Sequence, residues 1–107
     1  MTPLLLKVRR YIEDKLDDPG LYPSSIAAAH AISVRTLHLV FADTGTTVSR
    51  WIRDSRLKAC YRELSRSGRS ETVTDVAFRW GFNDAAHFSR TFKKAFGVTP
   101  SSVMLSA

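Results

Sequence analysis

The chain has 107 residues, of which 44% are hydrophobic and 24% are charged, and its formal net charge at pH 7 is +6. A single cysteine excludes an internal disulfide, and no apolar run approaches the roughly 18 residues of a membrane-spanning helix. We therefore expect a soluble, cytoplasmic chain, either one compact domain or two small lobes. The positive charge favours an anionic partner, although membrane surfaces and acidic proteins also attract basic chains.

Hydrophobic periodicity predicts three helices in the first part of the chain. The first covers about residues 3–16, and the second, which is rich in alanine, covers residues 24–30. Ser33 is placed to cap the third helix, which runs from residue 34 to about residue 44. Gly45 follows as the expected end of this helix.

The middle of the chain predicts one long helix, from about residue 47 to residue 66, whose apolar stripe changes side. At about 100° per residue, Val48 and Ile52 point in one direction, whereas Leu57 and Leu64 point in roughly the opposite one. A helix that packs first on one lobe and then on another would show this pattern.

A loop at residues 67–70 is expected to separate this helix from three more. Thr72 and Asp75 have the spacing of a capping pair for a fifth helix, residues 73–80. A short last helix is expected after Pro100.

The sixth predicted helix covers about residues 84–96 and carries three phenylalanines at four-residue intervals. Phe88, Phe92 and Phe96 are interpreted as core residues, because a small bundle needs such side chains to bury apolar area. No strand is predicted, so the expected fold class is all-α with about seven helices.

One pattern occurs twice, about fifty residues apart. In each copy an apolar residue and an alanine open a short helix, a turn follows, and a longer helix ends at a glycine. The corresponding residues are Ile26, Ala27, Leu37, Phe41 and Gly45 in the first copy and Val76, Ala77, Phe88, Phe92 and Gly97 in the second. This is the pattern of a helix-turn-helix, and two copies in a basic chain suggest a protein that reads two neighbouring stretches of DNA.

The outward faces of the third and sixth helices supply the candidate DNA-binding residues. Arginine can bond guanine, serine, threonine and histidine can bond base edges, and alanine can touch a thymine methyl. The candidates are Arg35, Thr36, His38 and Leu39 on the third helix and Ala86, Ser89, Arg90, Lys93 and Lys94 on the sixth. The alternative is a solvated face that binds nothing, and Leu39 could instead pack on the long helix.

The sequence offers little chemistry for catalysis. Cys60 lies on the apolar side of its helix, where a buried and inert thiol is expected. His30, His38 and His87 lack metal-ligand spacing, and no glycine-rich phosphate loop is present. We therefore expect no enzymatic activity, no metal, no cofactor and no small-molecule site.

The string from Val73 to Pro100, VTDVAFRWGFNDAAHFSRTFKKAFGVTP, resembles the C-terminal signature of the AraC/XylS family of bacterial transcription regulators. The resemblance implies seven helices in two helix-turn-helix lobes, whose third and sixth helices enter successive major grooves on one face of the DNA. It implies a single DNA-binding domain over residues 1–107, with a first lobe at about 4–46, a linker helix at about 47–66 and a second lobe at about 71–105.

The same resemblance assigns roles by position. It implies base readers at Arg35, His38 and Leu39 in the first lobe and at Ala86, Ser89 and Arg90 in the second, with backbone contacts from Thr36, Lys93 and Lys94. One departure is Ala31, which stands where the first turn often has glycine. If this residue is left-handed, alanine costs about 1–2 kcal/mol there.

The expected function is sequence-specific binding of double-stranded promoter or operator DNA by a transcription activator that also contacts RNA polymerase, with no membrane partner. Most family members carry a further effector or dimerisation domain, so the chain is either a stand-alone regulator or part of a longer one. The alternative is a helical protein-interaction module, or a degenerate regulator with only one DNA-reading lobe. The dependence of affinity on salt concentration distinguishes a DNA-binding protein from a protein-interaction module, because phosphate contacts weaken steeply as salt rises.

Overall fold

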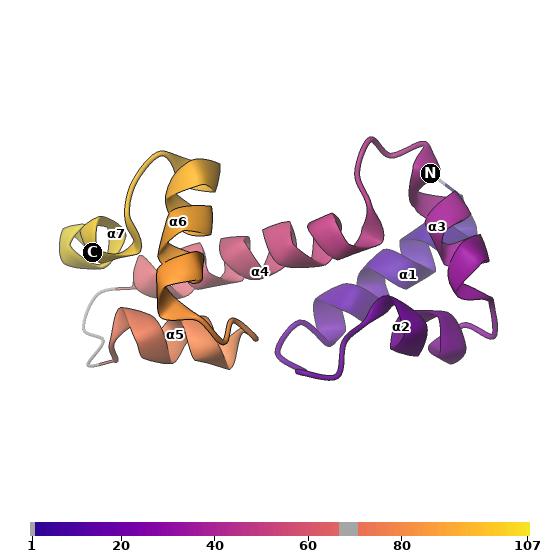
Figure 1. Ribbon diagram of the computed structural model, residues 1–107, viewed down its shortest axis with the longest axis horizontal. Helices are drawn as coiled ribbons and strands as arrows, with labels where there is room; N and C mark the ends of the chain where they lie inside the picture. Colours follow the sequence, from indigo (N-terminus) through magenta and orange to yellow (C-terminus); the bar gives the residue numbers. More distant parts are fainter. Residues whose placement is uncertain (1, 67–70) are drawn as a thin grey trace. The chain divides into compact units, whose positions relative to one another are not determined.

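The computed structural model describes residues 2–66 and 71–107, which form seven α-helices and no strand (Figure 1). The all-α class predicted from the sequence is confirmed, whereas the loop predicted at residues 67–70 lies outside the described residues. The helices are α1 (Pro3–Asp14), α2 (Pro23–Ala29), α3 (Val34–Ala42), α4 (Val48–Leu64), α5 (Val73–Arg79), α6 (Ala85–Phe96) and α7 (Pro100–Ser106).

The chain divides into two compact units, Met1–Ser55 and Arg56–Ala107, and the boundary between them falls inside α4. The first unit holds α1, α2, α3 and the beginning of α4, and the second holds the rest of α4 with α5, α6 and α7. The long helix predicted at residues 47–66 therefore runs from Val48 to Leu64 and contributes buried residues to each unit.

Side-chain caps determine where several helices begin. The Ser33 hydroxyl accepts from the backbone N–H of Thr36 at 3.0 Å, as predicted, so α3 begins directly after Ser33. The predicted pair at the start of α5 is a complete capping box: Thr72 Oγ1 accepts from the Asp75 N–H and Asp75 Oδ2 from the Thr72 N–H, each at 3.1 Å. These side chains satisfy N–H groups that have no partner inside the helix.

The ends of two helices differ from the prediction. α1 stops at Asp14 rather than residue 16, because the N–H of Lys15 bonds the carbonyl of Ile12 and tightens the chain into a turn. α3 stops at Ala42 rather than residue 44, because the backbone N–H and the hydroxyl of Thr44 both donate to the Phe41 carbonyl, at 3.0 Å and 2.7 Å. Gly45 follows in a left-handed conformation with φ of 81°.

The first unit buries one apolar face of each of its helices. α1 contributes Leu5, Val8 and Ile12, α2 contributes Ile26 and Ala27, α3 contributes Leu37 and Phe41, and α4 contributes Val48 and Ile52. The Phe41 ring lies 6.3 Å from the Trp51 ring, and the Arg9 guanidinium lies 5.3 Å over Trp51 in a cation–π contact. This packing fixes which face of α3 turns outward.

The second unit has one continuous core of buried residues, and the predicted phenylalanine ladder runs through it. The core consists of Leu57, Cys60, Leu64, Val76, Ala77, Phe88, Phe92 and Val103. Phe88 and Phe92 have no exposed surface, and their rings lie 5.6 Å apart. Phe96 is only half-buried and packs against this core from its edge.

The two copies of the sequence repeat have the same turn. The N–H of Ile32 donates to the Ala27 carbonyl at 3.0 Å, and the N–H of Phe82, fifty residues later, donates to the Ala77 carbonyl at 3.1 Å. The residue before each donor is left-handed, with φ of 54° at Ala31 and 92° at Gly81. At Gly81 a Cβ would also lie 3.0 Å from the guanidinium carbon of Arg56.

Ala31 is therefore strained, and its replacement by glycine should stabilise the protein. The left-handed conformation destabilises the folded state by about 1–2 kcal/mol when the residue is alanine. Glycine removes this strain, but it loses more conformational entropy on folding, which offsets about half of the gain. We expect Ala31→Gly to raise the free energy of unfolding by about 0.5–1 kcal/mol in urea titrations. The matched control Ala28→Gly, at an exposed position inside α2, should lower it by about 1 kcal/mol. Loss of stability in both variants would contradict the interpretation of strain.

Candidate nucleic-acid interface

Two short helices in the first unit meet at a sharp turn. The axes of α2 and α3 are bent by 97° at the break between them, within the range of helix-turn-helix motifs that place their second helix in a DNA groove. The second unit repeats the hydrogen bond and the left-handed residue of this turn between α5 and α6. The second helix of each pair, α3 or α6, is therefore the candidate recognition helix.

The outward face of α3 presents most of the residues selected from the sequence. Arg35 and His38 are exposed, and Leu39 has 64% of its surface exposed, so it does not pack on the long helix. Thr36 differs: it is half-buried, and its hydroxyl accepts from the Ser33 hydroxyl at 3.0 Å. Thr36 thus takes part in the helix cap, whereas the other three side chains face solvent.

The outward face of α6 lies opposite its phenylalanine ladder. Ala86, Arg90, Lys93 and Lys94 are exposed there, as predicted, but Ser89 is half-buried at the edge of the core. His87, which was not among the DNA-binding candidates selected from the sequence, is also exposed.

A helical projection of the sequence would have found His87. At about 100° per residue it stands about 60° from Arg90 around the helix axis and about 140° from Phe92. The ladder of phenylalanines fixes the inward direction, and the side chains farthest from it around the axis are Arg90 and Lys94, with His87 beside them. The spacing therefore indicated an outward position for His87, although the selection from residue type included only His38 among the histidines.

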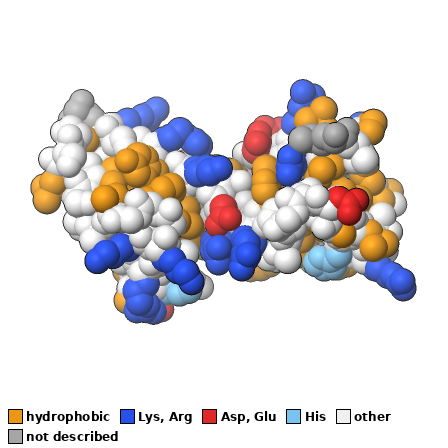
Figure 2. All heavy atoms as spheres, turned by 90° about the horizontal axis from the view of Figure 1, so that it is seen from above, with side chains coloured by type: hydrophobic (Ala, Val, Ile, Leu, Met, Phe, Trp, Pro, Cys, Tyr) orange, Lys and Arg blue, Asp and Glu red, His pale blue; other side chains and the backbone are white. Residues whose placement is uncertain are grey.

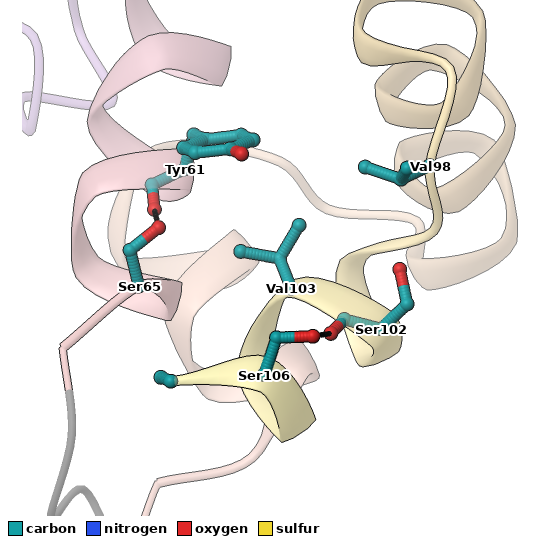
Figure 3. A pocket seen from close by; sticks show the side chains of 7 residues that line it. Tyr61, Ser65, Val98, Ser102, Val103 and Ser106 are labelled. Atoms are coloured by element: carbon teal, nitrogen blue, oxygen red, sulfur yellow. Dashed lines mark hydrogen bonds between the residues drawn. The ribbon is translucent and has the colours of Figure 1, made fainter.

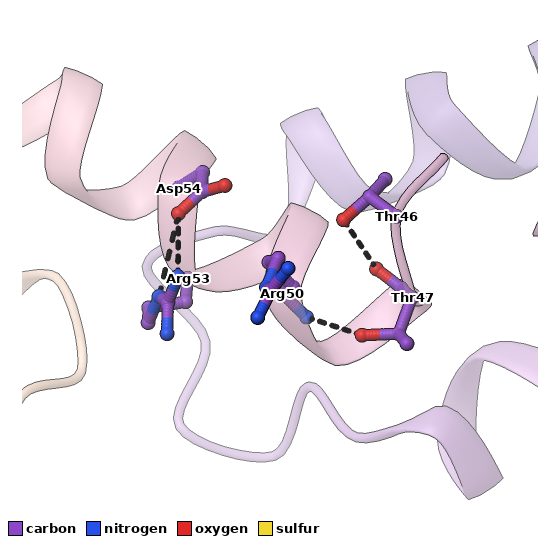
Figure 4. A network of polar contacts seen from close by, with 5 residues as sticks. All are labelled: Thr46, Thr47, Arg50, Arg53 and Asp54. Atoms are coloured by element: carbon purple, nitrogen blue, oxygen red, sulfur yellow. Dashed lines mark hydrogen bonds and ion pairs between the residues drawn. The ribbon is translucent and has the colours of Figure 1, made fainter. Parts of the chain in front are cut away.

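Some of the arginines form ion pairs with carboxylates of the same chain. Arg53 pairs with its neighbour Asp54 at 3.1 Å (Figure 4). The side chain of the nearby Arg50 forms no ion pair with any described residue. In the second unit, Arg79 pairs with Glu63 and, at 2.6 Å, with Glu71.

The candidate cations on the recognition helices are in a different position. Arg35 on α3 and Arg90, Lys93 and Lys94 on α6 take part in no ion pair within the described residues. These four unpaired cations suit a polyanion. On the face that Figure 2 shows, Lys and Arg side chains (blue) predominate over Asp and Glu side chains (red).

Asp84 holds the N-terminal end of α6. Its carboxylate accepts from the backbone N–H of His87 at 2.9 Å, and this bond holds the pKa of Asp84 below its usual range, with smaller contributions from Arg90 and His87. The carboxylate is therefore ionised at neutral pH, where it caps the helix and interacts favourably with the helix dipole.

Cys60 does not have the properties of a catalytic nucleophile. Cys60 is fully buried, and this burial raises the pKa of its thiol to about 12, with a further contribution from Glu63, so the thiol stays protonated and inert. Within residues 2–66 and 71–107 there is no group of three metal-ligating side chains. No single described helix is long and apolar enough to cross a membrane, although the bent pair α2–α3 would pass by length and composition alone.

The two matched turns and the cationic faces of the helices that follow them define a protein with two helix-turn-helix motifs. Comparison with known proteins agrees: a family model described as a helix-turn-helix domain matches residues 26–105. The transcriptional activator NphR of a Rhodococcus species is 43% identical over 99 residues, which cover 92% of this chain and 29% of NphR. The chain belongs to the AraC family of transcription regulators.

Solved structures share the fold over almost the whole chain. A probable AraC family regulator from Rhodopseudomonas palustris CGA009 superposes with a TM-score of 0.90 at 27% identity, covering 99% of this chain and 98% of that one. The DNA-binding domain of the transcription factor AdpA, solved in complex with a target DNA, has a TM-score of 0.80 at 22% identity and covers 95% of this chain and 90% of its own. The chain spans about three tenths of the length of the curated relatives that it matches.

Proposed function

We propose that this chain is a sequence-specific double-stranded DNA-binding domain of a bacterial transcription regulator, with α3 and α6 as its recognition helices. The observation that carries the proposal is the repeated turn, in which equivalent backbone bonds and left-handed residues precede two helices with exposed arginines. Two motifs in one chain let it read two neighbouring stretches of DNA without dimerising. AdpA, which shares the fold, was solved on a target DNA.

The roles of the candidate residues follow from chemistry and exposure. Arg90 and Arg35 each offer a bidentate donor pair for guanine, and Ala86 and Leu39 offer apolar contact for thymine methyls. Of the remaining candidates, His38 and Ser89 reach bases from the flank of their helices, and Thr36, Lys93 and Lys94 contact phosphates, which position the protein without specifying sequence.

The regulator would act in the bacterial cytoplasm, where promoter DNA lies. NphR is a transcriptional activator, and we extend this direction of regulation to the present protein. Activation requires contact with the transcription machinery, so RNA polymerase is the second partner that we propose.

A selection from random duplex DNA tests the function. The whole chain should enrich two short motifs about one helical turn apart, and the affinity for the selected DNA should fall steeply between two salt concentrations. One enriched motif would mean that a single helix-turn-helix reads bases. If no sequence is enriched and affinity responds weakly to salt, the chain is a protein-interaction module instead.

A further inference from the structure

A groove on the second unit lies apart from the outward face of α6. It consists of two adjoining hollows of about 240 Å³ and 390 Å³ that share Tyr61. The first lies between the end of α4 and α7 and is lined by Tyr61, Ser65, Val98, Ser102, Val103 and Ser106 (Figure 3), together with Ala107. The second is lined by Lys58, Tyr61, Arg62 and Phe96. We call the two together the Tyr61 groove.

The Tyr61 groove is more apolar than its residue types suggest. Three of its residues are serines, but their hydroxyls donate to carbonyls of their own chain segments, as Figure 3 shows for Ser65 and Ser106. Ser65 Oγ donates to the Tyr61 carbonyl, Ser102 Oγ to the Thr99 carbonyl and Ser106 Oγ to the Ser102 carbonyl, each at 2.8 Å. With these donors satisfied, the groove offers mainly the side chains of Tyr61, Val98 and Val103 to a ligand.

Tyr61 forms a rigid platform in this groove. Its ring stacks on Phe92 with a centroid distance of 5.9 Å and an angle of 9°, and it meets the Phe96 ring at 4.9 Å. One side of the ring is therefore held by the core, yet 38% of the residue remains exposed, as does 41% of Val98. A pre-ordered aromatic surface binds an apolar side chain without further loss of conformational freedom.

Two cations border the apolar part of the groove without a counter-charge. Lys58 and Arg62 lie four residues apart on α4, which places them on the same face of the helix, and Tyr61 stands between them in the sequence. Both cations line the second hollow. The carboxylates of the second unit are engaged elsewhere: Glu63 and Glu71 pair with Arg79, and Asp75 and Asp84 cap helices. Lys58 and Arg62 form no ion pair within the described part of the chain.

We propose that the Tyr61 groove docks an acidic amphipathic segment of a partner protein. An apolar side chain of that segment packs on Tyr61 between Phe96 and Val98, and neighbouring carboxylates of the segment meet Lys58 and Arg62. This is the helix-in-groove mode of recognition, with charge complementarity that excludes basic segments. The small size of the groove suits a weak and reversible contact.

Binding of this segment leaves the proposed DNA-reading face free. Phe96 and Phe92, which support Tyr61, stand about 120° or more from Arg90 and Lys94 around the axis of α6. The chain can therefore hold DNA and the acidic segment at the same time. The proposal does not rest on DNA binding, because its residues lie outside the candidate reading faces.

Peptide display tests the proposal without assuming a particular partner. Random 15-residue peptides selected on the whole chain should carry aspartate or glutamate next to a large apolar residue. A selected peptide, titrated into the ¹⁵N-labelled chain, should shift amide signals in the second half of α4, around Phe96–Val98 and in α7. Lys58→Glu combined with Arg62→Glu should weaken its binding at least about tenfold. Both residues border solvent, so the amide spectrum should otherwise remain that of the folded chain.

A charge-matched control separates this effect from net charge. Arg10→Glu combined with Lys15→Glu makes the same change at exposed positions of the first unit, and peptide affinity should stay within about twofold. The proposal is overturned if no peptide is enriched, if enriched peptides lack acidic residues, or if their signals map outside the groove. Displacement of the peptide by duplex DNA would also overturn it, since Lys58 and Arg62 would then belong to the DNA-binding surface. Enriched acidic peptides without any enriched DNA would refute only the DNA-binding function.

Discussion

Replacing Arg90 by alanine should reduce the affinity for the selected DNA by about 5- to 150-fold, which corresponds to the roughly 1–3 kcal/mol of a bidentate arginine–guanine contact. Affinity for random DNA should fall only by the amount expected for the loss of one phosphate contact. The reason is the position of Arg90, which is exposed on α6 opposite the phenylalanine ladder and forms no ion pair within the described residues. Titrations of both duplexes by fluorescence anisotropy measure the two losses.

Two further variants show whether the loss reflects base reading. Lys94→Ala should weaken cognate and random binding alike and lower the salt dependence by about one phosphate contact. Arg53→Ala removes an exposed arginine that already pairs with Asp54, so it should have a smaller effect on either DNA. Equal losses on cognate and random DNA in Arg90→Ala would assign Arg90 to phosphate contact instead of base recognition.

Truncating Phe88 should strongly destabilise the fold. Phe88 has no exposed surface and lies between the rings of Phe82, at 4.9 Å, and Phe92, at 5.6 Å. Phe88→Ala should therefore lower the free energy of unfolding by about 3–5 kcal/mol, the usual cost of the lost burial and the cavity that remains. Because whole domains are stable by only about 5–15 kcal/mol, urea titration should find this variant close to unfolding.

Phe78 provides the matched control for this prediction. It is the same residue type on the preceding helix, α5, but 52% of it is exposed. Phe78→Ala should change the free energy of unfolding by no more than about 0.5 kcal/mol. A loss of no more than about 0.5 kcal/mol for Phe88→Ala as well would show that Phe88 is less tightly packed than its burial indicates.

Several features of the fold were predicted because their causes are local. The caps at Ser33 and at Thr72 with Asp75 act within three residues, so their spacing in the sequence already specifies the bonds seen in the structure. The core positions of Phe88 and Phe92 follow from their four-residue interval on a helix. The all-α class follows from the same periodicity along the chain.

The candidate site was predicted less completely. The outward positions of Arg90 and Lys94 follow from the ladder opposite them. Ser89, however, was selected as a base reader but is half-buried, whereas His87 was not selected but is exposed. Residue type suggested a polar serine for base contact, whereas the packing of α6 on its neighbours decided which flank of the helix is open. The end of α3 was predicted incorrectly because the N–H and the hydroxyl of Thr44 both donate to the Phe41 carbonyl. Several polar residues can form such a bond to the backbone, so the sequence alone does not indicate which one ends the helix.

By itself the sequence determined the helices, the repeated motif, the resemblance to AraC regulators and the basic character of the chain, because these depend on periodicity, spacing and composition. Only the tertiary structure decided which charges are free and which surfaces are open. Glu63 pairs with Arg79, sixteen residues away, and Tyr61 stacks on Phe92 of another helix. Such contacts join residues far apart in the chain, so they form only once the helices have packed, and no local pattern specifies them.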